Sequence, residues 1–394
     1  MKKVISFFCL FLLITACVSC SLSAFAAGES INVYNWGEYI DQNVLDMFYD
    51  ETGIKVNYTT YDSNETMYSK IVSGAASYDV VVPSDYMISK MAQEGLLAEL
   101  DFNNIPNYKY IGDEYKGLEY DPDEKYSVSY TWGTVVVIYN TKFVDEEDVK
   151  DESVNLLWNE KYAGKILMFD NPRDAFGLAL KKAGYSLNSL NENDWSEAQK
   201  LLKEQKPLVQ AYVMDQIFDK MASEEAWIAP YYAGDAYTIQ QDNPDISFYL
   251  PKEGSNFFTD AMCVLKSSQN KENAEKFINF MCRTDIALMN AEEIGYGTPQ
   301  TETYKLLDEE VSSNELLYPS KEKLRNQTEV FINLPSNISM LQSALWTSLK
   351  VDGEESSTLG YDIAFYLIIG ILALILGVNI ITKQHRKRLY RTRE

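Results

Sequence analysis

The chain has 394 residues, of which 46% are hydrophobic and 24% are charged, and this length has room for two globular domains. The formal net charge is −23, and outside the first 26 and last 12 residues 27 basic residues face 57 acidic ones. Such a negative field repels nucleic-acid phosphate and attracts cations, so we expect a cationic partner and no nucleic acid. The one histidine is His385, which excludes Ser-His-Asp, Cys-His and histidine–metal sites elsewhere in the chain, and no glycine-rich phosphate loop is present. We therefore expect no catalytic residue, no metal and no cofactor.

Residues 1–26 are predicted to be a signal peptide. A basic pair and an apolar stretch precede an A-x-A cleavage pattern that ends at Ala26. Residues 14–17 read Ile-Thr-Ala-Cys, which resembles a lipobox and would leave Cys17 lipidated. We favour cleavage after Ala26, and the lipidated form stays an alternative.

Residues 363–382 contain no charged residue and are long enough to span a bilayer as a helix. The basic tail that follows, residues 383–394, belongs on the cytoplasmic side by the positive-inside rule. Residues 352–362 then form a stalk above the membrane. We therefore expect a cell-membrane protein whose ligand-binding part faces the periplasm or the outer surface.

Short apolar strands alternate with amphipathic helices in the first part of the remaining chain. A strand begins at Ile31, and further strands are predicted at 54–60 and 78–82. Helices are predicted from Asp41, over 65–72, and from Ser84, a natural N-cap, to Met91. Buried strands between helices are typical of a parallel or mixed sheet that is covered on both faces.

The middle of the chain contains loops and one crossing. Residues 101–123 are polar, and we expect them, with Asp121 and Asp123, to be solvent-exposed surface. Two strands, 126–132 and 134–140, are predicted to meet at Gly133 and to mark a domain boundary. The acidic run from Asp145 to Glu152 is expected to be a solvated face.

The alternation then restarts, which predicts a second α/β lobe. The expected strands lie at 164–169, 207–211, 226–231, 246–250 and 259–266. The expected helices lie at 173–184, 195–204, 272–282 and 339–349. Lobe 1 would comprise 27–133 and 258–301, and lobe 2 would comprise 134–257 and 302–351. Cys263 and Cys282 either form one disulfide or are two buried thiols.

Carboxylates and aromatic residues gather where the predicted strands end. Several have a structural explanation as well: Asp174 and Asp235 could cap helices, and Tyr296 could be a turn residue. Together they predict a site for an elongated organic cation, since carboxylates pair with ammonium groups and aromatic rings suit both the charge and the methylene stem. Ligands bind at the carboxyl ends of strands in open α/β sheets.

Several strings resemble the bacterial spermidine/putrescine-binding proteins, the extracytoplasmic receptors of polyamine ABC transporters. They are YNWGEY at 34–39, TGIKVNYTTYDSNETMYSK at 52–70, YDVVVPSDYM at 78–87, WG at 132–133, LPKEG at 250–254 and IGYGTPQ at 294–300. The resemblance covers residues 31–318 and implies a type II periplasmic-binding fold, with two α/β lobes and a ligand cleft between them. It implies ligand-binding roles for Trp36, Tyr39, Ser84, Tyr86, Asp174, Tyr232, Asp235, Phe258, Asp260 and Tyr296.

The sequence departs from this family's pattern at positions that bear on ligand length. Gly37 replaces a residue that often carries a hydroxyl group, and Asn171 replaces an Asp of the spermidine receptors. Tyr232 to Asp235 resembles the putrescine-receptor pattern, and Phe258 replaces a Trp of the spermidine type. Diamine and triamine ligands both stay open.

The interpretation favoured by the sequence is a membrane-tethered, monomeric polyamine receptor that delivers its ligand to an ABC permease and its ATPase, and not an enzyme. Two alternatives come from other classes of protein. One is a membrane-anchored hydrolase of the glycosidase type, with Asp174 and Asp260 as acid and base. The other is a surface polyamine sensor.

Overall fold

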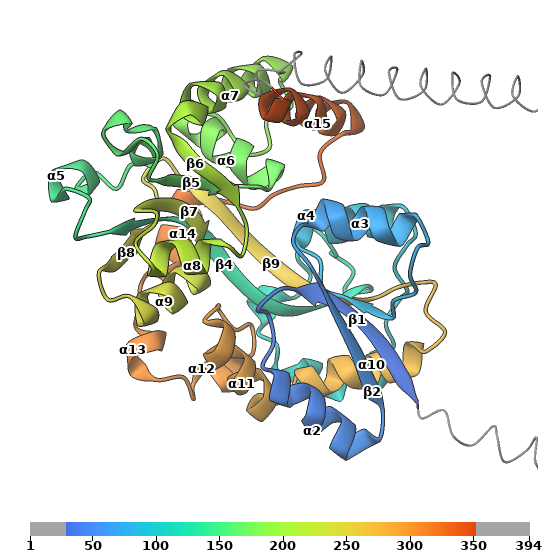
Figure 1. Ribbon diagram of the computed structural model, residues 1–394. Helices are drawn as coiled ribbons and strands as arrows, with labels where there is room; N and C mark the ends of the chain where they lie inside the picture. The colour runs from blue at the N-terminus through green and yellow to red at the C-terminus, as the bar shows by residue number, and fades with distance from the viewer. Residues whose placement is uncertain (1–28, 352–394) are drawn as a thin grey trace, which may run out of the picture. The chain divides into compact units, whose positions relative to one another are not determined.

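The computed structural model describes residues 29–351 (Figure 1). The chain divides into two units, residues 1–342 and residues 343–394. The predicted signal peptide, stalk, apolar stretch 363–382 and basic tail all lie outside the described residues, so they stay predictions. In the part that is described, no helix has both the length and the apolar character needed to cross a membrane.

One mixed ten-stranded sheet organises residues 29–342. Its order is β2-β1-β3-β9-β4-β7-β5-β6, with β8 added on β4 and β10 added on β9. Neighbours β1 and β2, β1 and β3, and β5 and β6 are parallel, whereas β9 runs antiparallel to β3 and β4. The strands are β1 Ser30–Trp36, β2 Lys55–Tyr61, β3 Val80–Val81, β4 Ser127–Asn140, β5 Ile166–Phe169, β6 Val209–Val213, β7 Ile228–Tyr232, β8 Ile246–Tyr249, β9 Ser255–Val264 and β10 Thr328–Glu329.

Strand β4 is a single strand of 14 residues that pairs with strands of both halves of the sheet, so the prediction of two strands that meet at Gly133 is wrong. Residues 127–134 pair with β9, and residues 135–140 pair with β7 and β8. Gly133 does not interrupt the strand; a Cβ atom there would lie 2.8 Å from the Phe258 ring, so glycine permits close packing inside a continuous strand.

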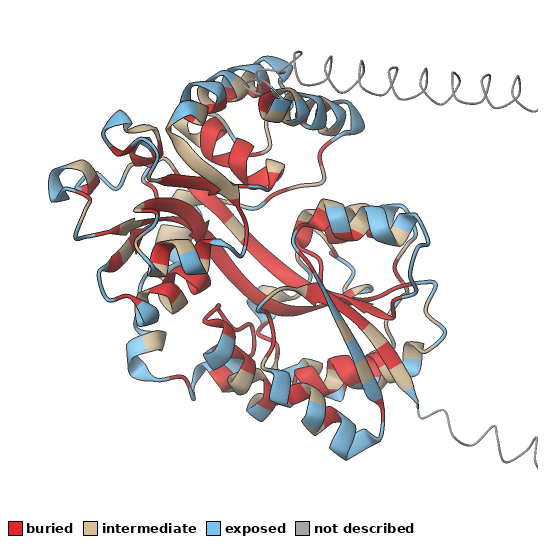
Figure 2. Cartoon of the chain, viewed as in Figure 1, coloured by how far each residue is buried: buried red, intermediate tan, exposed pale blue. Residues whose placement is uncertain are grey.

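Helices cover both faces of the first half of the sheet, as Figures 1 and 2 show. Val33 packs with Phe48 and Phe277 under α2 and α10, whereas its neighbour Tyr34 packs with Met67 under α3 and α4. Successive residues of a strand point to opposite faces, which is why neighbouring apolar residues of β1 belong to two different cores. The helices concerned are α2 Gln42–Thr52, α3 Asn64–Val72, α4 Asp85–Gln93, α10 Lys271–Met281 and α11 Thr284–Ile294.

The second half of the sheet has its own core, in which Phe169, Phe176 and Trp195 are fully buried. Its main helices are α6 Pro172–Lys182, α7 Glu192–Gln205, α8 Ile217–Ala222 and α9 Ala233–Asp242. Shorter helices are α5 Glu146–Val149, α12 Thr301–Tyr304, α13 Glu309–Ser312 and α14 Lys321–Gln327, and α15 Ser336–Val351 runs from the first unit into the second. The 3-10 helices span Phe102–Asn104, Pro106–Tyr110, Asp113–Tyr115, Val154–Trp158, Glu160–Tyr162 and Lys206–Leu208.

The predicted alternation of strands and helices is confirmed in both halves, but α8, α9 and α11 were not predicted. Helix α9 begins directly at Ala233, after Tyr232 has ended β7, so no loop signal separates the two elements. Cys263 and Cys282 are free and buried, which excludes the disulfide.

The prediction that Asp121 is a solvent-exposed charge is wrong. Asp121 is only 5% exposed, and its carboxylate accepts hydrogen bonds from the backbone N–H groups of Lys125, Tyr126 and Ser127 and from the Ser127 hydroxyl group. It is therefore a structural anchor of the loop that enters β4. Asp123 and Asp145 are exposed, as predicted.

A candidate ligand-binding cleft

The ten residues predicted to bind a ligand line a single cavity. This cleft has a volume of about 690 Å³, including open solvent at its mouth. The residues come from distant parts of the chain: Trp36, Tyr39, Ser84, Tyr86, Asp174, Tyr232, Asp235, Phe258, Asp260 and Tyr296. The structure therefore brings together what the sequence places in six separate stretches.

Ends of strands and starts of helices position these side chains. Trp36 is the last residue of β1, Ser84 and Tyr232 are the N-caps of α4 and α9, and Asp174 lies in the first turn of α6. Asp260 comes instead from the interior of β9. Because β1 and β3 are parallel, as are β5 and β7, the carboxyl ends of each pair deliver side chains to the same edge.

Asp260 lines the cleft and has an unused hydrogen-bond acceptor. Its Oδ2 atom accepts a hydrogen bond of 2.5 Å from the Tyr39 hydroxyl group, which also lies 2.7 Å from Thr131 Oγ1. Its Oδ1 atom is buried and has no hydrogen-bond partner. Burial raises the pKa of Asp260 to about 6, and contacts with Ser84 and Tyr39 oppose that rise.

Asp174 shows the same pattern on the other side of the cleft. Its Oδ2 atom accepts hydrogen bonds from the Tyr232 hydroxyl group at 3.0 Å and from Asn171 Nδ2 at 2.7 Å, whereas its buried Oδ1 atom has no partner. Burial raises the pKa of Asp174 to about 7. Asn171 is the N-cap of α6 and accepts from the backbone N–H groups of residues 173 and 174, and Asp174 occupies the acidic first-turn position, as the helix-cap explanation predicts. That explanation leaves the buried Oδ1 atom without a partner.

Asp235 is the third buried carboxyl group of the cleft. Its Oδ2 atom accepts a hydrogen bond of 2.6 Å from the Tyr296 hydroxyl group, and burial raises its pKa to about 8. Tyr296 is therefore no mere turn residue, since its hydroxyl group reaches across to α9. Ser84 does not cap α4 with its side chain; its Oγ atom accepts from Asn64 Nδ2 instead.

Aromatic rings separate the carboxyl groups. The Phe258 ring makes edge contacts with Tyr232 at 5.3 Å and with Tyr296 at 5.9 Å between ring centroids. The Trp36 ring lies 6.5 Å from that of Tyr39, and its Nε1 atom donates a hydrogen bond to the carbonyl oxygen of Val82, which fixes its orientation. Such rings offer flat apolar walls and attract cations through their faces.

Sequence reasoning missed part of the lining. Glu38, Asp62, Asp85 and Asp215 bring the number of lining carboxyl groups to seven, and none of the lining residues is Lys or Arg. Asp215 follows β6, so the carboxyl-end rule could have found it. A Cβ atom on Gly37 would lie 2.6 Å from Asp215 Oδ2, so the missing side chain at position 37 leaves room for this carboxylate.

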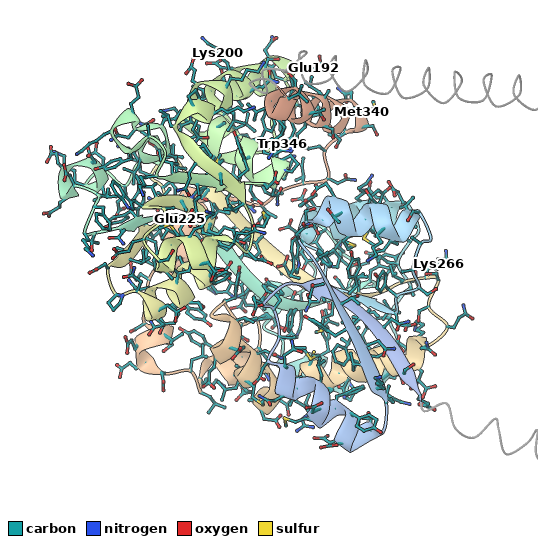
Figure 3. The ribbon with its side chains drawn as sticks, viewed as in Figure 1. Glu192, Lys200, Glu225, Lys266, Met340 and Trp346 are labelled. Carbon is teal, nitrogen blue, oxygen red and sulfur yellow. The ribbon has the colours of Figure 1, made fainter. Side chains whose placement is uncertain are left out.

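Basic residues lie elsewhere. Lys200 and Lys266, labelled in Figure 3, are exposed and project from the outer surface. The cleft thus combines seven carboxyl groups, two of which hold unused buried oxygen atoms, with aromatic walls. Charge-assisted hydrogen bonds from ammonium groups would satisfy those oxygens. The arrangement is chemically complementary to an elongated molecule with at least two positive charges.

An α/β fold with a cleft at its strand ends is typical of solute-binding proteins. Residues 76–327 match the family of bacterial extracellular solute-binding proteins, and residues 1–119 match a family described as hypothetical lipoproteins (MG045 family). The chain belongs to the bacterial extracellular solute-binding proteins, and within them to the group of the spermidine/putrescine-binding proteins.

Individual relatives support the assignment to this family. The spermidine/putrescine-binding periplasmic protein of Escherichia coli K12 is 36% identical over 318 residues, which cover 80% of this chain and 91% of that protein. The putrescine-binding periplasmic protein PotF of the same organism is 27% identical, over 85% of this chain and 95% of that protein. The solved structure of a putative spermidine/putrescine ABC transporter from Listeria monocytogenes is 40% identical, with a TM-score of 0.78, and covers 82% of this chain and 99% of that one. The fold is therefore the α/β periplasmic-binding-protein fold, and the hydrolase and sensor interpretations gain no support from these relatives.

Proposed function

We propose that this protein is a polyamine receptor that binds spermidine, putrescine or both and delivers them to an ABC-type permease and its ATPase. The observation that carries the proposal is the pair of buried oxygens, Asp174 Oδ1 and Asp260 Oδ1, which lack hydrogen-bond partners in a cleft lined without Lys or Arg. Buried polar atoms are almost always satisfied, so a partnerless carboxylate oxygen in a cavity points to a ligand that donates. The relatives are named as proteins that bind spermidine, putrescine or cadaverine, which agrees with this chemistry.

The ligand's ammonium groups would pair with Asp174, Asp260 and Asp235. Its methylene stem would lie against the rings of Phe258 and Tyr232, where it loses contact with water while the charges stay paired. The net charge of −23 would attract such a cation toward the cleft.

Two lobes would close on this ligand. The proposed division places 27–133 and 258–301 in lobe 1, and 134–257 and 302–351 in lobe 2. Strands β4 and β9 run through both, so the crossings near Trp132–Gly133 and Phe257–Phe258 would act as hinges, together with Gln300–Thr301. Small-angle scattering should show compaction when polyamine is added; an unchanged radius at saturation would contradict closure.

The protein would be tethered to the membrane with its cleft outside the cytoplasm. A signal peptide over 1–26 and a membrane-spanning helix over 363–382 are the proposed targeting elements. Protease added to intact spheroplasts should degrade the receptor but spare an epitope after residue 394. Labelling with a radioactive fatty acid that disappears in Cys17→Ala would indicate lipidation in place of cleavage after Ala26.

Calorimetry tests the proposal directly. Residues 27–360, produced without the apolar stretch, are expected to be soluble and monomeric and to bind putrescine, spermidine or spermine without added metal. Glutamate and glycine betaine serve as controls, one carrying a net negative charge and the other a single fixed positive charge. Absence of heat with every polyamine, or binding that a chelator abolishes, would refute the proposed function.

A further inference from the structure

Arg173 is a buried cation next to the cleft whose hydrogen-bonding capacity is only partly used. It lies in the first turn of α6 and is 3% exposed. Its Nη2 atom donates to Asn188 Oδ1 at 2.9 Å and to the carbonyl oxygen of Ile332 at 3.2 Å. Its Nε and Nη1 atoms are buried and have no partner. Burial lowers the pKa of Arg173 to about 10, the sign of a charge held away from water.

Glu65 is the matching anion on the opposite side. It lies in α3, and its Oε1 atom accepts a hydrogen bond of 3.0 Å from the Tyr86 hydroxyl group, whereas its Oε2 atom is buried and has no partner. The guanidinium carbon of Arg173 lies 5.6 Å from the centre of the Tyr86 ring, so one tyrosine contacts both charges. In the described part of the chain, neither residue forms an ion pair within 4.0 Å.

The other carboxyl groups that face Arg173 are already engaged. Asp85 uses both oxygens, since Oδ1 accepts from the N–H of Tyr86 at 2.6 Å and Oδ2 accepts from the N–H of Thr259 at 3.3 Å. Asp174 lines the cleft, and its free oxygen is the one assigned above to the proposed ligand. Of the three carboxyl groups, Glu65 therefore supplies the oxygen, Oε2, that remains for the two free N–H groups of Arg173.

We propose that Arg173 and Glu65 form an ion pair that joins α6 to α3 when the cleft closes on its ligand, which makes Arg173 a positioning residue for the bound state. The inference rests on the proposed function and on the two-lobe closure. Leaving charged groups buried without a full set of partners is costly, so a small approach of α3 to α6 that pairs them is favourable. Arginine's planar fork suits such a contact with a carboxylate. Because Asp174 follows Arg173 directly in α6, ligand contact and pairing would move the same helix.

A double-mutant cycle on the full-length chain in detergent tests the pair. The variants are Glu65→Gln, which keeps an acceptor for the Tyr86 hydroxyl group, Arg173→Met, and both together. Each single change should weaken spermidine or putrescine binding roughly 30-fold or more, mainly through faster dissociation, because it leaves one charge buried and unpaired in the closed form. The double variant should bind the ligand at least as tightly as the single variant that has the lower affinity.

The same helix offers a matched control. Lys181, also in α6, already forms an ion pair with Glu329 in this structure. The cycle of Lys181→Met and Glu329→Gln should show coupling in the thermal stability of the empty protein and none in ligand affinity. The Glu65 and Arg173 cycle should show the reverse, with Glu65→Gln leaving the melting temperature of the empty protein unchanged or higher.

The outcomes separate three cases. Additive losses of affinity, or equal coupling in the empty and the ligand-bound protein, would overturn the pair while leaving the polyamine function intact. Failure of the unmodified protein to bind any polyamine would refute the function itself. If Arg173→Met does not fold, the distance between spin labels on exposed Ser69 of α3 and Lys200 of α7 can be measured in the Glu65→Gln variant instead, with and without ligand. Their ligand-induced approach should be smaller than in the unmodified protein, and an equal approach would overturn the proposal.

Discussion

Two sets of buried carboxylates in this molecule differ in how completely their oxygens are hydrogen-bonded. Asp121 and Asp79, outside the cleft, have both oxygens occupied: Asp121 accepts from the Lys125 to Ser127 segment, and Asp79 accepts from the backbone N–H of Asn32 and from Ser268 and Asn270. Asp174 and Asp260, inside the cleft, each keep one buried oxygen free. Among these four carboxylates, burial alone therefore does not distinguish the cleft, whereas unused hydrogen-bonding capacity does.

The cleft set should govern affinity, and it gives the largest expected effect. Replacing Asp174 or Asp260 by Asn leaves an ammonium group buried without its counter-charge, and truncating such a pair typically costs about 2–5 kcal/mol, or roughly 30-fold to several thousandfold in affinity. The empty protein should be as stable as before or more stable, because a buried carboxylate that has only neutral donors on one of its oxygens has been replaced by a neutral amide. Calorimetry and thermal unfolding measure the two effects separately.

Exposed Asp123, which pairs with exposed Lys125, is the control for that experiment. Asp123→Asn should change affinity by less than about 0.5 kcal/mol, and the change should fade with added salt. If both cleft variants bind polyamine like the unmodified protein, the site assignment is wrong whatever the relatives bind.

The set outside the cleft, Asp121 and Asp79, should govern the stability of the protein and not its affinity for ligand. Asp121→Ala strands the N–H groups of Lys125, Tyr126 and Ser127 near the start of β4, and each buried donor left unsatisfied costs about 1–3 kcal/mol. Denaturant unfolding should show a loss in that range or larger, with the dissociation constant of the folded fraction within about twofold of the original. A selective loss of affinity at unchanged stability would contradict the distinction between the two sets.

Titration should sharpen the contrast, because burial raises the pKa of Asp260, Asp174 and Asp235 to about 6, 7 and 8. A carboxyl group whose pKa is higher in the folded state contributes stability that is complete below its unfolded pKa of about 4 and is lost as the pH rises through the folded value. The empty protein should therefore lose stability between about pH 4 and pH 8 through these groups.

Ammonium ligands require the ionised carboxylates, so affinity should change in the opposite direction. We expect it to rise roughly 10- to 100-fold from about pH 5.5 to pH 8, with release of protons on binding. Calorimetry in buffers of different ionisation enthalpy measures that release. Asp235→Asn should remove the part of the rise nearest pH 8, and a pH-independent affinity with no proton release would contradict the raised pKa values.

The smallest expected effect concerns ligand length. Asn171→Asp keeps an oxygen for capping α6 but replaces the amide that donates to Asp174, which adds a negative charge to the cleft. Spermidine affinity should improve relative to putrescine by about three- to tenfold, a difference of up to ~1.4 kcal/mol, since the triamine carries the extra ammonium group. Asn171→Ser, which keeps a cap and adds no charge, is the control; equal changes for both ligands would contradict a role in length selection.

The order of strands and helices could be predicted from the chain alone, because hydrophobic periodicity and capping residues are local. Asp41 caps α2, and Asn171 with Pro172 begins α6, where these residues stand in the sequence. The ten cleft residues could be named in advance as well, partly from strand ends and partly from the resemblance to a family. Each of these residues belongs to a short sequence pattern that can be recognised without knowing which other segments it contacts.

Only the tertiary structure decided how those residues are partnered. Asp121 lies in a polar loop and Asp260 in a strand, yet both are buried, and nothing nearby in sequence shows that the first is satisfied and the second is not. Tyr39 reaches Asp260 across 221 positions of the chain, and Glu65 and Arg173 come from helices more than a hundred residues apart. Hydrogen-bond satisfaction and burial depend on which segments the sheet brings together, so they are properties of the packed molecule and have no signature in a local pattern.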